Sequence, residues 1–63
     1  MLTARIIVEA PERGKRRLLC YDPANLKTVD TGMKVSENDV DKAVRALKLT
    51  LEKAGNRVEV LVR

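Results

Sequence analysis

The sequence predicts a small α+β domain, in which one amphipathic helix packs on one face of a mainly antiparallel sheet. Alternating apolar residues near both ends of the chain indicate strands, and apolar residues spaced three and four apart between them indicate a helix. The expected order is a small β-hairpin, a weak third strand, the helix and a C-terminal strand. A chain of 63 residues fits a single domain, residues 1–63, with a thin hydrophobic core.

A β-hairpin is predicted at the start of the chain. Residues Leu2–Ala10 alternate in polarity, so that one face of the strand is wholly apolar and consists of Leu2, Ala4, Ile6, Val8 and Ala10. Pro11 ends this strand because it has no backbone N–H, and Gly14 permits a turn. A second strand then runs over Arg17–Tyr21. We expect a loose, charged loop between the two strands.

The segment after the hairpin has a less regular pattern. Asp22, Pro23 and Asn25 indicate a second turn. Over Leu26–Val35 several apolar residues lie on one side, but Gly32 is expected to bend or end any strand there. We therefore predict a weak third strand over this range.

The helix is predicted to begin at Ser36, whose hydroxyl can accept a backbone N–H of the first turn, with Asp39 placed as in a capping box. Its apolar residues form one stripe, which consists of Val40, Val44, Leu47, Leu51 and Ala54. Acidic residues gather near its start and basic residues near its end, as the helix dipole favours. Gly55 is expected to end the helix in a left-handed conformation.

The last strand is predicted over Arg57–Arg63, directly after a turn of Gly55 and Asn56. Because this turn is so short, the strand should run antiparallel to the helix and beneath it. Its partner strand cannot be read from the sequence. Its apolar character favours a place beside the first strand, at the centre of the sheet.

A single helix covers only one face of the sheet, which leaves apolar residues on the other face. Ile7, Leu19 and Leu61 are predicted there, and Leu49 projects from the helix away from its apolar stripe. This pattern favours a homo-oligomer, such as a homodimer, or a complex with a protein partner that buries the open face. Self-association would also reinforce the thin core. The alternative is that sheet twist and loop residues cover these side chains within one chain.

The residue types give little support for catalysis or metal binding. Histidine is absent, which removes the usual proton shuttle and the usual activator of a Ser or Cys nucleophile. Cys20 alone cannot supply a zinc site, and in a strand it is more typical of a buried hydrophobe than of a reactive thiol. The segment RGKRR lacks the pattern of a Walker phosphate loop. We therefore predict no enzyme, catalytic residue, metal, cofactor or small-molecule substrate.

Positive charge is concentrated in the predicted hairpin loop. The chain has 13 basic and 9 acidic residues, a net charge of +4, and four of the cations lie close together at Arg13, Lys15, Arg16 and Arg17. Cations that reach a phosphate backbone together release counterions together, and arginine binds phosphate oxygens through two parallel hydrogen bonds. Tyr21 is the single aromatic residue, so binding by base stacking has little support.

Two functions follow from these features. The first is a non-enzymatic module that contacts the phosphate backbone of RNA or DNA through the basic loop, with weak sequence preference. The second is a protein–protein adaptor or assembly subunit that acts through the open face of its sheet, with the loop merely solvated or in contact with an acidic protein.

The amino terminus indicates where the protein resides. Arg5 and Glu9 interrupt its apolar run, which therefore fits neither a signal peptide nor a membrane-spanning helix. A single cysteine is typical of a reducing compartment. We expect a cytoplasmic protein with no membrane partner.

Overall fold

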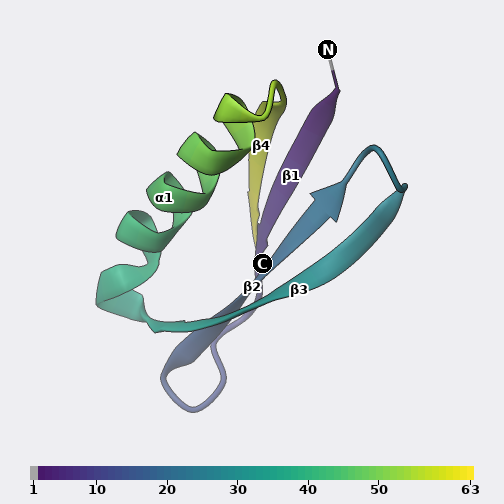
Figure 1. Cartoon of the computed structure of the whole chain (residues 1–63). Helices are drawn as coiled ribbons and strands as arrows, with labels where there is room; N and C mark the ends of the chain where they lie inside the picture. Colours follow the sequence, from purple (N-terminus) through teal and green to yellow (C-terminus); the bar gives the residue numbers. More distant parts are fainter. Residues whose placement is uncertain (1) are drawn as a thin grey trace.

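The computed structural model describes residues 2–63. Its elements follow in the order β1 (Thr3–Val8), β2 (Lys15–Asp22), β3 (Lys27–Ser36), a 3₁₀ turn η1 (Glu37–Asp39), α1 (Val40–Lys53) and β4 (Arg57–Val62) (Figure 1). The four strands form one sheet in the order β3-β2-β1-β4. The β1–β2 and β2–β3 pairs are antiparallel, and β4 runs parallel to β1. The predicted α+β class and the place of the last strand beside the first are confirmed.

The core lies between α1 and one face of the sheet, which we call the covered face. The side chains of Ala4, Ile6, Val8 and Leu18 are fully buried there. Five partly buried residues from β3 and α1 pack against this core, namely Met33, Val35, Val40, Val44 and Leu47. Ala43, which the predicted stripe omitted, is the buried residue of α1. Its small side chain lets the helix pack close to the sheet.

The turn between β1 and β2 is tight at its tip, so the prediction of a loose loop was wrong. The backbone N–H of Glu12 donates to the carbonyl of Lys15 at 2.8 Å, and that of Lys15 donates to the carbonyl of Glu12 at 3.1 Å. Between them, Arg13 has a φ of 53° and Gly14 a φ of 77°. Two successive positive φ angles are what a type I′ turn requires, and such a turn matches the twist of its strands.

Strand β3 is as long as the weak strand predicted over Leu26–Val35, and it continues through Gly32 because a bulge absorbs the glycine. The register against β2 shifts between Arg17 and Leu19, and Gly32 has a φ of 81° at this point. The carboxylate of Asp30 accepts the backbone N–H of Gly32 at 2.8 Å, and the hydroxyl of Thr31 donates to the carbonyl of Leu18 at 2.7 Å. These contacts stabilise the bulge within the sheet, so Gly32 bends the strand and does not end it.

The helix begins and ends near the predicted residues, but its start is capped differently. Ser36 is the N-cap residue of the helical segment, as predicted, but its hydroxyl donates to the carboxylate of Asp39 at 3.0 Å. It makes no hydrogen bond to the backbone of the first turn, so the predicted capping hydrogen bond was wrong. The 3₁₀ turn η1 takes the place of the first α-helical turn. Gly55 has a φ of 91° after the last turn, which confirms its predicted role in ending the helix.

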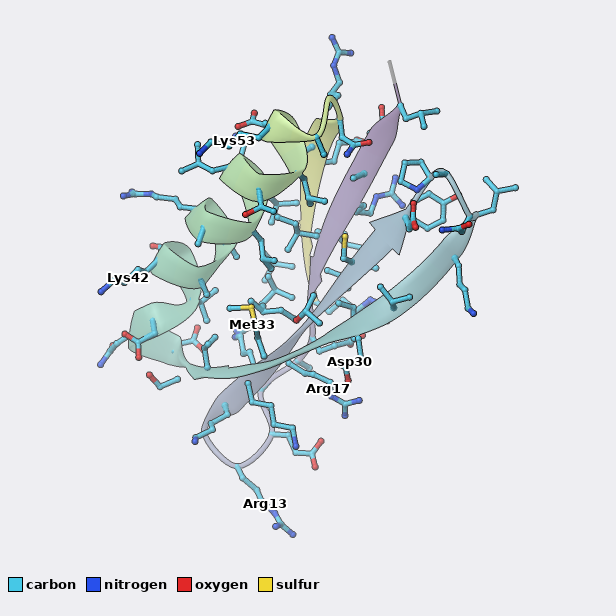
Figure 2. The ribbon with its side chains drawn as sticks, in the orientation of Figure 1. Arg13, Arg17, Asp30, Met33, Lys42 and Lys53 are labelled. Atoms are coloured by element: carbon cyan, nitrogen blue, oxygen red, sulfur yellow. The ribbon has the colours of Figure 1, made fainter. Side chains whose placement is uncertain are left out.

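Leu49 is the one large apolar side chain exposed on α1. Leu49 is 59% exposed, in agreement with its predicted direction away from the apolar stripe. Lys42 and Lys53 project from the side of α1 that faces away from the sheet (Figure 2). No helix formed by residues 2–63 is long and apolar enough to cross a lipid bilayer.

Candidate functional site

Two adjacent arginines of β2 lie on opposite faces of the sheet, because side chains alternate along a strand. Arg16 is on the covered face, opposite Val35 of β3. Arg17 is on the other face, which we call the open face, in the same alternation as Leu19. The four cations predicted as one phosphate-binding group are therefore divided between the two faces.

Arg16 is held by three elements at the end of the sheet. Its Nε donates to Oε2 of Glu37 at 2.7 Å, and one terminal nitrogen donates to the carbonyls of Arg63 at 3.1 Å and Glu9 at 3.4 Å. The Arg16 side chain is only 15% exposed. These contacts join the start of the helical segment to the ends of β1 and β4, which is a structural task.

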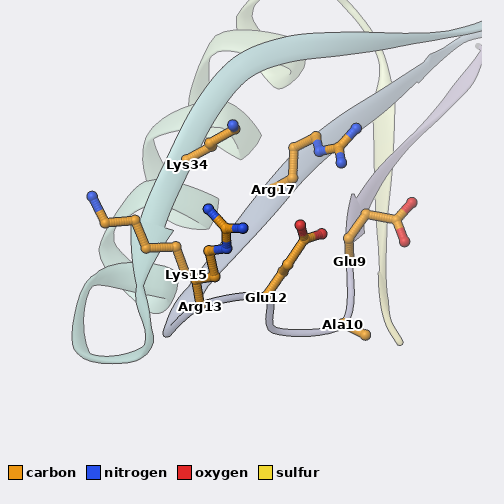
Figure 3. Close-up of a pocket in the computed structure, with 7 residues that line it drawn as sticks. All are labelled: Glu9, Ala10, Glu12, Arg13, Lys15, Arg17 and Lys34. Carbon is orange, nitrogen blue, oxygen red and sulfur yellow. The ribbon is translucent and has the colours of Figure 1, made fainter.

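The other three predicted cations line a hollow beside the hairpin turn (Figure 3). The hollow has a volume of about 580 Å³ and is lined by Glu9, Ala10, Glu12, Arg13, Lys15, Arg17 and Lys34. Two segments distant in sequence form it, namely the β1–β2 hairpin and the end of β3 that pairs with it. Four cations and two carboxylates therefore surround one open depression.

The acidic residues only partly neutralise this hollow. Glu9 forms an ion pair with Arg63 at 3.5 Å, and Arg17 forms a long one with Asp30 at 3.7 Å, in which both side chains are 48% exposed. Among residues 2–63, the remaining lining cations and Glu12 enter no salt bridge; these cations are Arg13, Lys15 and Lys34. The hollow thus keeps an excess of positive charge.

Lys34 is the lining cation that the sequence analysis missed. It lies directly opposite Arg17 on the neighbouring antiparallel strand. Like charges in directly opposed positions destabilise a sheet, so this pair has no structural benefit. Figure 3 shows both side chains over the same hollow. The polar position of Lys34 between Met33 and Val35 was visible in the sequence, but its partner depends on the bulge at Gly32.

The predicted apolar interface is brought together on the open face, but it is less exposed than expected. Ile7 lies between Leu19 and Leu61 in the sheet register. Ile7 is only 7% exposed and Leu19 is partly buried, whereas Leu61 is 41% exposed. Neighbouring side chains and the twist of the sheet therefore cover Ile7 within one chain. Leu49 lies on α1, which packs on the covered face, so it does not join this row.

The single aromatic residue lies away from the cationic hollow. Tyr21 pairs with Arg5 on the open face and lines a smaller hollow of about 290 Å³ with Thr3, Arg5 and Glu59. Neither of these hollows combines an aromatic ring with the hairpin cations. The arrangement offers charge without a stacking platform.

Cys20 has the environment of a structural residue. Burial raises the pKa of the Cys20 thiol, and the nearby carboxylate of Asp22 raises it further. The adjacent arginines do not lower it, because Arg16 is engaged with Glu37 and Arg17 lies on the other face. The thiol is therefore protonated at neutral pH and a poor nucleophile.

Metal binding receives no support from the side-chain clusters of residues 2–63. Among residues 2–63, no three cysteine or acidic side chains gather into a group that could hold a metal ion. Comparisons with protein-family models, with curated proteins and with solved structures find no match to this chain.

Proposed function

We propose that this chain is a small, non-enzymatic, cytoplasmic module that contacts the phosphate backbone of RNA or duplex DNA through the cationic hollow. The observation that carries the proposal is the placement of Arg17 directly opposite Lys34, beside Arg13 and Lys15 at the hairpin turn. Four cations from two strands and a tight turn thereby line one depression. A phosphate group placed there relieves their mutual repulsion.

The chemistry of the hollow favours a backbone contact over base recognition. Arginine can bind two phosphate oxygens in parallel, and lysine acts as a compact point charge. The sole aromatic ring lies at the other hollow, and α1 packs on the covered face, away from the hairpin cations. Binding should therefore depend strongly on salt and weakly on nucleotide sequence.

The rigid turn gives the hollow its shape. The paired hydrogen bonds between Glu12 and Lys15 fix the backbone of Arg13 at the tip of the turn. On the covered face, the hydrogen bonds of Arg16 to Glu37 and Arg63 join the start of β2 to the helical segment and to the end of β4. The cations of a rigid turn lose less conformational entropy on binding than those of a loose loop. This geometry favours a binding site over a solvated run of charge.

The proposal can be tested by fluorescence anisotropy with labelled duplex RNA, duplex DNA and single-stranded DNA across a series of salt concentrations. We expect Lys34→Ala and Arg17→Ala each to weaken binding to all three probes. The slope of log K against log salt should fall by about 1 for each cation removed. Lys53→Ala is the matched control, because Lys53 is an exposed cation on α1 and projects away from the sheet (Figure 2).

The outcomes separate the proposal from its rivals. Equal losses for Lys34→Ala and Lys53→Ala would show a diffuse charge effect and contradict a defined site. Absence of binding at low salt would overturn the nucleic-acid proposal. Retention of an acidic protein by the wild type, lost in Lys34→Ala while nucleic acid is ignored, would assign the same hollow to a protein partner.

A further inference from the structure

Strand β4 is an apolar edge of the sheet. It is the last strand in the order β3-β2-β1-β4, so within residues 2–63 it pairs only with β1. Its exposed apolar side chains are Val60 at 44%, Leu61 at 41% and Val62 at 61%. Val60 and Val62 pair with the buried Ile6 and Val8 on the covered face, so their exposure shows that α1 leaves the second half of β4 partly uncovered. Such an edge can accept another strand.

The opposite edge of the sheet is protected and β4 is not. Both edge strands carry charged side chains, but only β3 contains a bulge and the left-handed Gly32. A bulge is one of the means by which edge strands avoid pairing. Strand β4 has an unbroken register of six residues with β1 and contains neither proline nor glycine.

The backbone hydrogen bonds show which residues of β4 face the free edge. The N–H groups of Arg57 and Arg63 donate to carbonyls at the β1 side, those of Leu2 and Val8, at 2.8 and 2.9 Å. Alternate residues of a strand direct their backbone groups to the same side. Val58, Val60 and Val62 therefore present their N–H and C=O groups outward, ready to pair with another strand.

We propose that a second copy of this chain pairs its β4 antiparallel with the first, with Val60 opposite Val62 and Leu61 opposite Leu61 on the two-fold axis. This register places the outward backbone groups opposite one another. It also places Glu59 of each copy opposite Arg63 of the other, which gives two symmetric pairs of opposite charge. The charge pattern of β4 is thus complementary to itself.

Three other registers that keep the faces aligned are worse. Pairing Val60 with Val60 sets Arg57 against Arg63, and pairing Val58 with Val60 sets Glu59 against Glu59. Pairing Val58 with Val58 requires a hydrogen bond from the backbone N–H of Asn56. That N–H already donates to the carbonyl of Leu51 at 3.1 Å.

The resulting dimer has one continuous sheet of eight strands, built from two four-stranded sheets. Leu19, Ile7 and Leu61 are neighbours across the open face of each copy, so the dimer extends them into one apolar row. A two-fold axis perpendicular to the sheet keeps both open faces on the same side. The two cationic hollows then also lie on that side, because Arg17 and Lys34 face it.

Sedimentation velocity tests the interface on the full chain, in reducing buffer, at concentrations between about 1 and 100 µM. We expect a reversible dimer of the wild type and a monomer for Val60→Lys. Val29→Lys is the matched control, because Val29 lies on the other edge strand and is also 44% exposed. It should remain dimeric. Circular dichroism of each variant shows whether it is folded.

Charge exchange tests the register itself. We expect Glu59→Arg and Arg63→Glu each to raise the dimer Kd about tenfold or more, because both symmetric pairs become repulsive. The double variant should recover most of the wild-type affinity. Within one chain, Glu59→Arg places an arginine beside Arg5, and Arg63→Glu places a glutamate beside Glu9. Both intrachain contacts are repulsive in the double variant, so recovery of dimer affinity can come only from the contact between copies.

Three results would overturn the proposal. The first is a wild-type chain that stays monomeric throughout the concentration range. The second is a dimer that dissociates in Val29→Lys and persists in Val60→Lys, which would assign the contact to β3. The third is a double charge-exchange variant as weak as either single variant, which would exclude this register.

Discussion

Arg16 and Glu37 are 21 positions apart in the chain, and the Arg16 Nε donates to the Glu37 Oε2 at 2.7 Å. The contact joins β2 to η1, at the point where the helical segment leaves the sheet. Its neighbour Arg17 faces the opposite side of the sheet, toward Lys34. One pair of adjacent arginines therefore combines a structural role with the proposed binding role, and the two roles can be separated by mutation.

Arg16→Ala should destabilise the protein, whereas Arg17→Ala should not. Loss of the Arg16 guanidinium leaves the carbonyls of Glu9 and Arg63 without this donor. We expect the free energy of unfolding to fall by about 1–2 kcal/mol for Arg16→Ala and by less than about 0.5 kcal/mol for Arg17→Ala. Urea denaturation followed by circular dichroism measures both. Equal effects on stability would contradict the division of roles.

Glu12→Gln should strengthen anion binding at the hollow. Glu12 is exposed, lines the hollow and enters no salt bridge among residues 2–63, so its charge opposes a bound phosphate. We expect affinity for duplex RNA at low salt to rise roughly threefold, and the gain to shrink as salt screens the charge. Anisotropy titrations at two salt concentrations measure the change. Weaker binding by Glu12→Gln would indicate that the anion lies elsewhere.

Asp22 should make a part of the stability depend on acid pH. Hydrogen bonds from the side chain of Asn25 and the backbone of Ala24 lower the pKa of Asp22 below its ordinary value of 3.8. The ionised form is thus favoured by folding, so its stabilising effect is complete above the unfolded pKa and is lost as pH falls through the folded pKa.

Asp22→Asn provides the test of this dependence. We expect the wild type to be more stable than Asp22→Asn above about pH 5, and the difference to shrink below about pH 4. Thermal unfolding at a series of pH values measures it. A difference that is independent of pH in this range would show that ionised Asp22 has no special role in the turn.

Leu26→Asn should stabilise the turn between β2 and β3. Leu26 has a φ of 54° and is 78% exposed, so it bears the cost of a left-handed conformation without a compensating burial. Asparagine tolerates this conformation better. We expect the free energy of unfolding to rise by about 0.5 kcal/mol, measured by urea denaturation. Leu49→Asn, at another exposed leucine in regular helix, should give no such gain.

Local patterns in the sequence were sufficient for most of the fold. Alternation defined β1 and β4, three- and four-residue spacing defined α1, and Gly55 marked its end, because each depends on neighbours in the chain. The apolar character of the last strand also indicated its place beside β1. Strand ends differed by a few residues, since hydrogen bonds across the sheet decide where pairing stops.

By itself, the sequence determined the α+β class, the concentration of cations near the first turn and the presence of apolar residues on both faces of the sheet. Only the tertiary structure decided which cations line the same hollow. The bulge at Gly32 shifts the register of β3 so that Lys34 lies opposite Arg17. Glu37, at the start of the helical segment, accepts a hydrogen bond from Arg16 on the other face. Both outcomes depend on contacts between residues far apart in the chain, which no local pattern encodes.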